Sequence, residues 1–209
     1  MAGCFSDFLR KNYEIHEWRH ACAILAGAFS EELEDITDVL SRFRLLKSHL
    51  TVGGGRKSSI AEWIDTQLST KGWVEKGFKT LISVDGNQME SPTHKIDCFK
   101  NSIALEIEWN NKDPFFDRDL NNFRLLFDLR AVSVGIIVTR CDELQEIFDS
   151  LGRGSSYGAS TTHLSKLLPR IEGGGGGGCP LLAFGIRRSL YVQDSLHPSA
   201  AHGSGGFAD

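Results

Sequence analysis

The N-terminal third of the chain carries apolar residues at helical spacing. This pattern predicts a helix over residues 14–28 and a second helix over residues 31–44, where Ile36 and Leu40 fall on one face. A glycine-rich stretch, TVGGGRKSS, then interrupts the pattern. A third helix is expected after Ser59, which is followed three residues later by a glutamate, the spacing of a capping box.

After the third helix the period shortens to the two-residue alternation of strands. The run FKTLISV meets Asp85 and Gly86, a pair that favours a tight hairpin turn. Two further short runs, KIDCF and SIALEIEW, predict a second hairpin that turns at Lys100 and Asn101. The middle of the chain is therefore expected to form strands.

The C-terminal half alternates helices with buried strands. We expect a helix over 117–130, a buried strand over 131–139, a helix over 142–152, a short helix in TTHLSKLLPR, a hexaglycine spacer over 173–178 and a last strand in PLLAFGI. This order predicts an α/β fold, with a central mixed sheet flanked by helices. We divide the chain into an N-terminal helical region (1–50), a core (51–192) and a disordered tail (193–209).

Three carboxylates interrupt the second predicted hairpin. With the turn expected above, Asp97 pairs with Ala104 and Lys95 pairs with Glu106. Alternation then places these acids and Glu108 on the face opposite the apolar side chains, about 5–8 Å apart. Clustered hard oxygen ligands suit Mg²⁺. The alternative is an exposed sheet face on which Lys95 partly neutralises Glu106.

Composition and charge narrow the expected location and partners. The chain has 209 residues and a net charge of −4, yet residues 42–79 carry eight basic and three acidic side chains. They form either a local positive field or solvated helix faces. The five cysteines lack zinc-site spacing, which favours reduced thiols in a cytoplasmic protein. We expect neither a transmembrane helix nor a signal peptide, because no apolar run is long enough.

The acidic hairpin resembles a known nuclease motif. The spacing Asp-x8-Glu-x-Glu, from Asp97 through Glu106 to Glu108, resembles the PD-(D/E)XK nuclease superfamily. The wider stretch HKIDCFKNSIALEIEWNNKDPFFDRDLNNFRLL is similar to the BglII-type restriction endonucleases, with likeness from about Gly55 to Ile186. The resemblance implies a Mg²⁺-dependent type II restriction endonuclease with a PD-(D/E)XK core, a homodimer that cuts double-stranded DNA at a short palindromic site. It also implies that Asp97 and Glu106 bind Mg²⁺ and that Glu108 is catalytic, although most of the superfamily has lysine there and close relatives have glutamine.

Three polar segments are candidate DNA contacts. They are Arg56, Lys57 and Ser58 before a helix N-terminus; Asn110, Asn111 and Lys112 after the catalytic strand; and Ser155, Ser156 and Tyr157 in a later loop. The first segment suits the phosphate backbone, and the second suits the edges of adenine and guanine. The alternatives are a solvated connector for the first segment and a plain loop before a helix cap for the third.

Two other functions remain open. One is a catalytically silent DNA-binding or regulatory module of the same fold, which the glutamate at position 108 would permit. The other is a repair or structure-specific nuclease. The intact pair Asp97 and Glu106 favours an enzyme. A cognate DNA methyltransferase would belong to the same system, with no direct contact implied.

Overall fold

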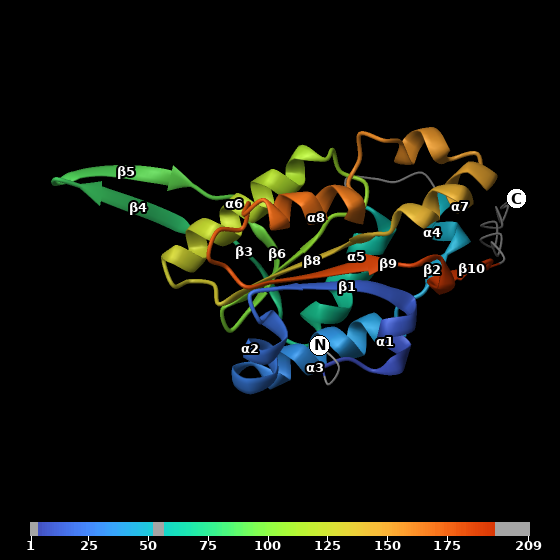
Figure 1. Ribbon diagram of the computed structural model, residues 1–209, viewed down its shortest axis with the longest axis horizontal. Helices are drawn as coiled ribbons and strands as arrows, with labels where there is room; N and C mark the ends of the chain where they lie inside the picture. The colour runs from blue at the N-terminus through green and yellow to red at the C-terminus, as the bar shows by residue number, and fades with distance from the viewer. Residues whose placement is uncertain (1–3, 52–56, 195–209) are drawn as a thin grey trace, which may run out of the picture.

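The centre of the molecule is a six-stranded mixed sheet in the order β1-β9-β8-β7-β6-β3 (Figure 1). The computed structural model describes residues 4–51 and 57–194, so Arg56 and most of the predicted tail lie outside the described residues. The strands are β1 (Tyr13–Trp18), β9 (Leu181–Ile186), β8 (Val134–Arg140), β7 (Ile103–Ile107), β6 (Ile96–Lys100) and β3 (Val74–Lys76). Strands β7, β8 and β9 are parallel, and the others run antiparallel to their neighbours. The predicted mixed α/β arrangement is confirmed.

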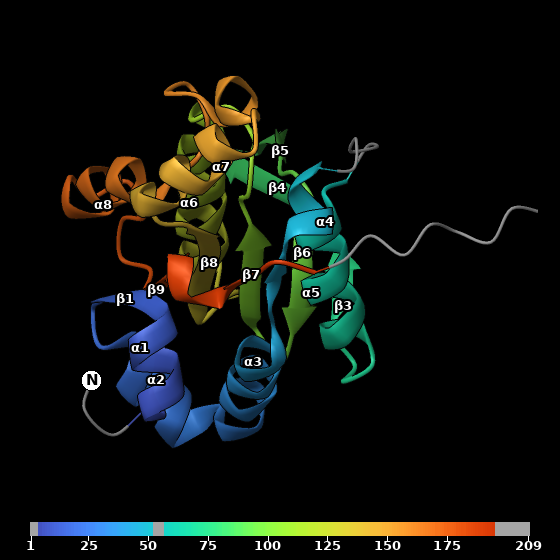
Figure 2. The same cartoon turned by 90° about the vertical axis from the view of Figure 1, so that its right-hand side faces the viewer.

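Helices cover both faces of this sheet (Figure 2). On one face lie α6 (Pro114–Asp128) and α8 (Leu164–Glu172); on the other lie α1 (Asp7–Asn12), α2 (Ala21–Ala28), α3 (Ser30–Arg42) and α5 (Ser59–Ser69). The shorter elements are β2 (Leu45–Leu46), α4 (Lys47–Thr51), α7 (Gln145–Ser150) and β10 (Tyr191–Val192), with 3-10 turns at Asp142–Leu144, Gly154–Tyr157 and Arg188–Leu190. Each face of the sheet therefore has its own apolar core.

The helix predicted over residues 14–28 is wrong in its first part. Residues 13–18 form β1, which pairs antiparallel with β9. Arg19 and His20 then take left-handed φ angles of 54° and 59°, and α2 follows. The segment YEIHEW fits either period, and tertiary pairing decides between them because β1 satisfies the backbone groups along the edge of β9.

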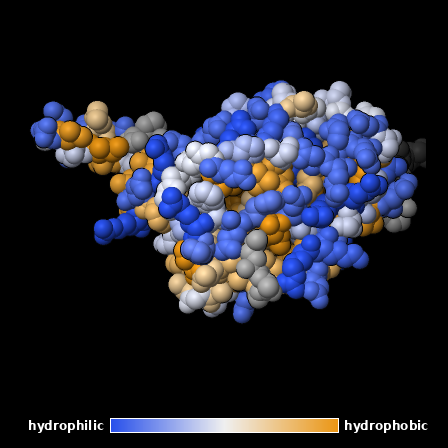
Figure 3. All heavy atoms as spheres, viewed as in Figure 1, coloured by the Kyte–Doolittle hydropathy of each residue, from blue (hydrophilic) through white to orange (hydrophobic). Residues whose placement is uncertain are grey.

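The hairpin predicted at Asp85 and Gly86 is confirmed. It joins β4 (Lys79–Val84) to β5 (Asn87–Pro92) in a separate two-stranded sheet. Both turn residues have positive φ, 49° and 83°, as a two-residue hairpin turn of this kind requires. The hairpin projects from the body of the molecule (Figure 1) and carries exposed apolar side chains such as Leu81 and Met89 (Figure 3).

The second hairpin turns one residue later than predicted. Its turn lies at Asn101 and Ser102, whose φ angles are 44° and 67°, and Phe99 pairs with Ala104. The register therefore differs by two residues from the predicted one. A shift of two keeps every side chain on its predicted face, so the acids still lie on one face.

The hexaglycine stretch, residues 173–178, is packed rather than a spacer. A Cβ atom on Gly176 would lie 2.5 Å from Cδ1 of Leu181, and one on Gly177 would lie 2.5 Å from Cγ of Arg124. Gly177 also has a φ angle of +57°. These glycines allow the chain to turn tightly between α8 and β9 against α6.

Candidate active site

Glu106 lies at the centre of the candidate site, in strand β7. The residue is only 1% exposed. Its Oε1 lies 3.2 Å from Nε2 of His94, and its Oε2 accepts a hydrogen bond of 3.2 Å from the backbone N–H of Asp97. Burial, together with the charges of Asp119 and Asp97, raises the pKa of Glu106 well above its ordinary value. The acid is thus not on an exposed sheet face, and Lys95 pairs with Glu75 instead of neutralising it.

Asp97 lies beside Glu106 on the neighbouring strand, β6. Its Oδ2 accepts a hydrogen bond of 3.1 Å from the backbone N–H of Ile107. Burial raises the pKa of Asp97, while the hydrogen bond from Ile107 and the charge of Lys57 act in the opposite direction. The first two acids of the motif are therefore held on adjacent strands by hydrogen bonds from each other's strand.

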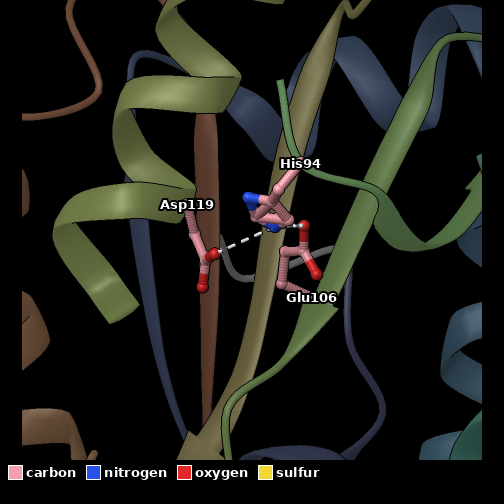
Figure 4. Close-up of side chains that lie close together, drawn as sticks. All are labelled: His94, Glu106 and Asp119. Carbon is pink, nitrogen blue, oxygen red and sulfur yellow. Dashed lines mark hydrogen bonds and ion pairs between the residues drawn. The ribbon is translucent and has the colours of Figure 1, made fainter. Parts of the chain in front are cut away.

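His94 and Asp119 complete a group around Glu106 (Figure 4). His94 precedes β6, and Asp119 lies on α6 with 0% exposure. Nε2 of His94 is 3.4 Å from Oδ1 of Asp119, in addition to its contact with Glu106. One ligand atom from each of the three residues lies within 4.8 Å of the others. A helix, a strand and a connecting segment thus bring three potential metal ligands together.

The sequence patterns did not single out His94 or Asp119. A signal for Asp119 does exist, because it shares the buried face of α6 with Phe116 and Phe123. A carboxylate in an apolar stripe is costly unless it has a partner or a ligand. For His94 the local sequence offers no comparable signal.

Glu108, the third acid of the motif, is also buried, with 2% exposure. Its Oε2 accepts a hydrogen bond of 2.8 Å from the side-chain amide of Asn111, and its Oε1 is 3.3 Å from Nη2 of Arg118. Burial and the charge of Asp119 raise the pKa of Glu108 to about 9. Burial also raises the pKa of Asp119 to about 6, against the charge of Arg118. Glu108 therefore holds a proton near neutral pH.

The segment after β7 lies beside the later polar loop. Lys112 forms an antiparallel bridge with Thr161, and the backbone N–H of Thr162 donates to the carbonyl of Asn111 at 2.8 Å. Asn110, Asn111 and Lys112 are exposed. The predicted base-reading segment therefore lies against the later polar loop, at residues 160–162, and Asn111 also contacts Glu108.

Arg140, at the end of β8, holds the later loop in place. Its Nη2 donates to the carbonyl of Tyr157 and to Oγ1 of Thr161, each at 2.8 Å, and the residue is 1% exposed. The ring of Tyr157 is buried, whereas Ser155 and Ser156 are exposed. The loop thus presents its serines to solvent.

The predicted phosphate contacts lie at the start of α5. Ser58 caps this helix by accepting a hydrogen bond of 3.1 Å from the N–H of Ala61, one residue earlier than the predicted cap. Nζ of Lys57 lies 2.8 Å from Asp65. Arg56 is outside the described residues. Lys57 is close enough to Asp97 for its charge to lower the pKa of that acid.

The donor set fits a divalent cation. Asp97 and Glu106 offer carboxylate oxygens, and His94 and Asp119 add an imidazole nitrogen and a further carboxylate. Asp119 also shares a side-chain hydrogen bond with Glu108. Oxygen-rich sites of this kind suit Mg²⁺ and Mn²⁺. Buried acids so close together stay charged only beside a cation, which agrees with the raised pKa values.

Within residues 4–51 and 57–194, no helix is long and apolar enough to cross a membrane.

Comparison with known proteins and protein families indicates which family the chain belongs to. No curated protein sequence matches the chain. A scan of family models matches residues 13–186 to the family described as restriction endonuclease BglII/BglIII. The matched range runs from β1 to β9 and includes the acidic hairpin. The chain therefore belongs to the BglII/BglIII family of restriction endonucleases, and it is a type II restriction endonuclease, a nuclease that cleaves DNA.

Proposed function

We propose that this nuclease is a Mg²⁺-dependent type II site-specific deoxyribonuclease that cleaves double-stranded DNA at a short palindromic site. The observation that carries the proposal is the buried carboxylate of Glu106, held beside Asp97 and in contact with His94. A DNA phosphodiester is itself an anion. A cation is therefore needed before the phosphate can approach these acids.

Asp97 and Glu106 are the proposed Mg²⁺ ligands. When bound, Mg²⁺ supplies positive charge to the phosphoryl oxygens and makes the attacking water more acidic. The chain orients both carboxylates in advance, since Asp97 accepts the N–H of Ile107 and Glu106 accepts the N–H of Asp97. Groups fixed in this way need little rearrangement during the reaction.

Glu108 is the third proposed catalytic residue. Its pKa of about 9 makes it a proton donor rather than a strong base near neutral pH. Its hydrogen bond to Asn111 connects the acidic site to the proposed base-reading surface. A change at the bases contacted by Asn111 can thereby alter the position of a catalytic acid.

The proposed DNA contacts lie in three segments. Asn110, Asn111 and Lys112 read base edges; Ser155, Ser156 and Tyr157 belong to the adjoining loop; and Arg56, Lys57 and Ser58 bind the phosphate backbone. The exposure of residues 110–112 and their pairing with the later loop support the first two assignments. The position of Ser58 at the N-terminus of α5 supports the third.

The proposed assembly is a two-fold homodimer in the cytoplasm, because a palindromic site mirrors the symmetry of a dimer. Residues 51–192 are the proposed nuclease core. The N-terminal region, residues 1–50, is the proposed dimer interface through its helices α1 to α3. A cognate DNA methyltransferase would protect the same sites, with no direct contact to the nuclease.

The test is digestion of a large phage DNA with Mg²⁺, using the wild-type protein, Glu106→Gln and the matched control Glu90→Gln. Glu90 lies exposed on strand β5 of the projecting hairpin, opposite Leu81, and is not part of the acidic group. We expect discrete fragments from the wild type and from the control, and none from Glu106→Gln. Sequencing of the fragment ends then gives the site.

Other outcomes would contradict the proposal in different ways. A smear of fragments would show a nuclease without site specificity, as in repair enzymes. Absence of cleavage with binding retained in a gel shift would show a silent DNA-binding module. Ends without two-fold symmetry would contradict the palindromic site.

A further inference from the structure

Glu106 turns its two oxygens toward different neighbours. Oε2 accepts the backbone N–H of Asp97, whereas Oε1 lies 3.2 Å from Nε2 of His94. Asp119 reaches the same histidine nitrogen from α6, at 3.4 Å (Figure 4). The group of three ligand atoms within 4.8 Å does not include the carboxylate of Asp97. Glu106 therefore borders two separate sets of possible ligands.

Nearby cations do not balance the acids on the His94 side. Glu106 and Asp119 are 1% and 0% exposed. The nearest arginine, Arg118, lies 2.9 Å from Oδ1 of Asp119, but its side chain is 40% exposed and it also contacts Glu108 at 3.3 Å. A single half-exposed guanidinium is shared among buried carboxyl groups and is partly screened by solvent. Arg118 alone therefore does not neutralise the carboxylates of Glu106 and Asp119.

A polar cavity beside the group provides an independent observation. It has a volume of about 260 Å³ and is lined by Thr93, His94, Arg118, Asn121, Asn122 and Leu125. Asn122 is 4% exposed and lies one helical turn after Asp119. Its Oδ1 has no hydrogen-bond partner among the residues that the structure describes. Buried oxygens of this kind are normally satisfied by water or by an ion.

We propose that His94, Glu106 and Asp119 form a second divalent-cation site, which shares Glu106 with the Asp97 site. The proposal rests on the proposed function only in that the shared carboxylate belongs to the nuclease motif. First-row transition ions accept an imidazole nitrogen, whereas Mg²⁺ prefers oxygen ligands. Mn²⁺ accepts carboxylates as well and is paramagnetic, so Mn²⁺ alone is the probe for this site.

The test counts and identifies Mn²⁺ ligands in the full-length protein without DNA. Electron spin resonance of free Mn²⁺ gives the number of ions bound per chain, and spin-echo modulation detects a coordinated nitrogen. We expect two ions and a nitrogen modulation that changes when the protein carries ¹⁵N-labelled histidine. His94→Gln should bind one ion and lose the modulation. The control His163→Gln, which removes an imidazole paired with Asp142, should keep both.

The wild-type protein with ¹⁵N-labelled histidine shows by itself whether a histidine nitrogen binds Mn²⁺. The test therefore remains valid even if a variant fails to fold. Two bound ions without histidine nitrogen coupling, or a coupling that survives His94→Gln in a folded protein, would overturn the second site. One bound ion per chain without histidine nitrogen coupling would overturn it too. Mg²⁺-dependent cleavage tests the proposed function separately, because it needs only the Asp97 site. Cleavage is therefore expected even if the second site does not exist.

Discussion

Burial changes the chemistry of the acid at position 108. In water a glutamate is charged near neutral pH, but burial and the charge of Asp119 raise the pKa of Glu108 to about 9. Superfamily members with a lysine at this position have a cation there. This chain instead has a carboxyl group whose raised pKa keeps it protonated near neutral pH. The side-chain contact with Asn111 then fixes the orientation of that group.

The raised pKa of Glu108 predicts how the stability of the cation-free protein depends on pH. An acid whose pKa is higher in the folded chain than in the unfolded chain binds more protons when folded. The free energy of unfolding therefore falls as the pH rises from the unfolded-state pKa to the folded-state pKa. The pKa values of His94 and Asp119 are about 4 and about 6, and that of Glu108 is about 9. The range from pH 6.5 to about 9 therefore lies above the first two pKa values and reports on the ionisation of Glu108.

Urea unfolding with a chelator present checks this prediction across that pH range. We expect the wild type to lose stability from the lower to the upper end, and Glu108→Gln to show a flatter profile because it cannot release the proton. Parallel profiles for the two proteins would show that Glu108 ionises normally. Below pH 6.5 the lowered pKa of His94 acts with the opposite sign, so that region is left out of the comparison.

Two segments have the composition of flexible loops, but their contacts fix their conformation. The hexaglycine turn is one of them, because Gly177 combines a φ angle of +57° with a close approach to Arg124. The paired segments 110–112 and 158–162 are the other. Backbone pairing joins these two loops, and the buried guanidinium of Arg140 holds the second one in place.

Gly177→Ala should destabilise the protein by about 1–2 kcal/mol, because an alanine in the left-handed region is strained and its Cβ meets Arg124. The control is Gly27→Ala in α2, where nothing lies within 4 Å of the added Cβ. Alanine in a helix should stabilise the protein there by roughly 0.5–1 kcal/mol. Urea unfolding measures both changes. Equal effects of the two substitutions would mean that the hexaglycine stretch is a spacer after all.

Lys112→Ala should weaken binding to the recognised site by about 1–3 kcal/mol, because a lysine that contacts a guanine edge is lost. Lys79→Ala is the matched control, since Lys79 is an exposed lysine on the projecting hairpin. Binding of a duplex that contains the site, compared with one in which the site is scrambled, measures the effect. The assignment fails if Lys112→Ala weakens binding to both duplexes equally, which is the behaviour of a phosphate contact.

The sequence predicts most of the fold because its strong patterns are local. The Asp85-Gly86 turn and the apolar face of α3 each lie within a short window, and both are confirmed. Strand β1 depends on its pairing with β9, which lies far along the chain, and its own residues fit a helix equally well. Hairpin alternation predicts that Asp97 and Glu106 share one face of the sheet. Asp119 comes from a separate helix, and no spacing rule places it beside them.

The whole molecule is expected to act as a pair of chains. Sedimentation of the protein with a duplex that contains the recognised site should give two chains per DNA, because a palindromic site offers two equivalent halves. The interface proposed for residues 1–50 makes the same assembly expected without DNA. A single chain on the DNA at every protein concentration would contradict the two-fold assembly.

The proposed function depends on Glu106 lying in a cation-dependent DNA-cleaving site. The most direct test is the single-turnover rate of cleavage of one duplex by the wild type, Glu106→Gln and Glu90→Gln with Mg²⁺. Loss of a ligand that supports several kcal/mol of charge stabilisation should slow Glu106→Gln by about a thousandfold or more. Glu90→Gln should cleave at the wild-type rate, and a chelator should stop cleavage by both. Cleavage by Glu106→Gln near the wild-type rate, or undiminished cleavage with the chelator, would contradict the claim.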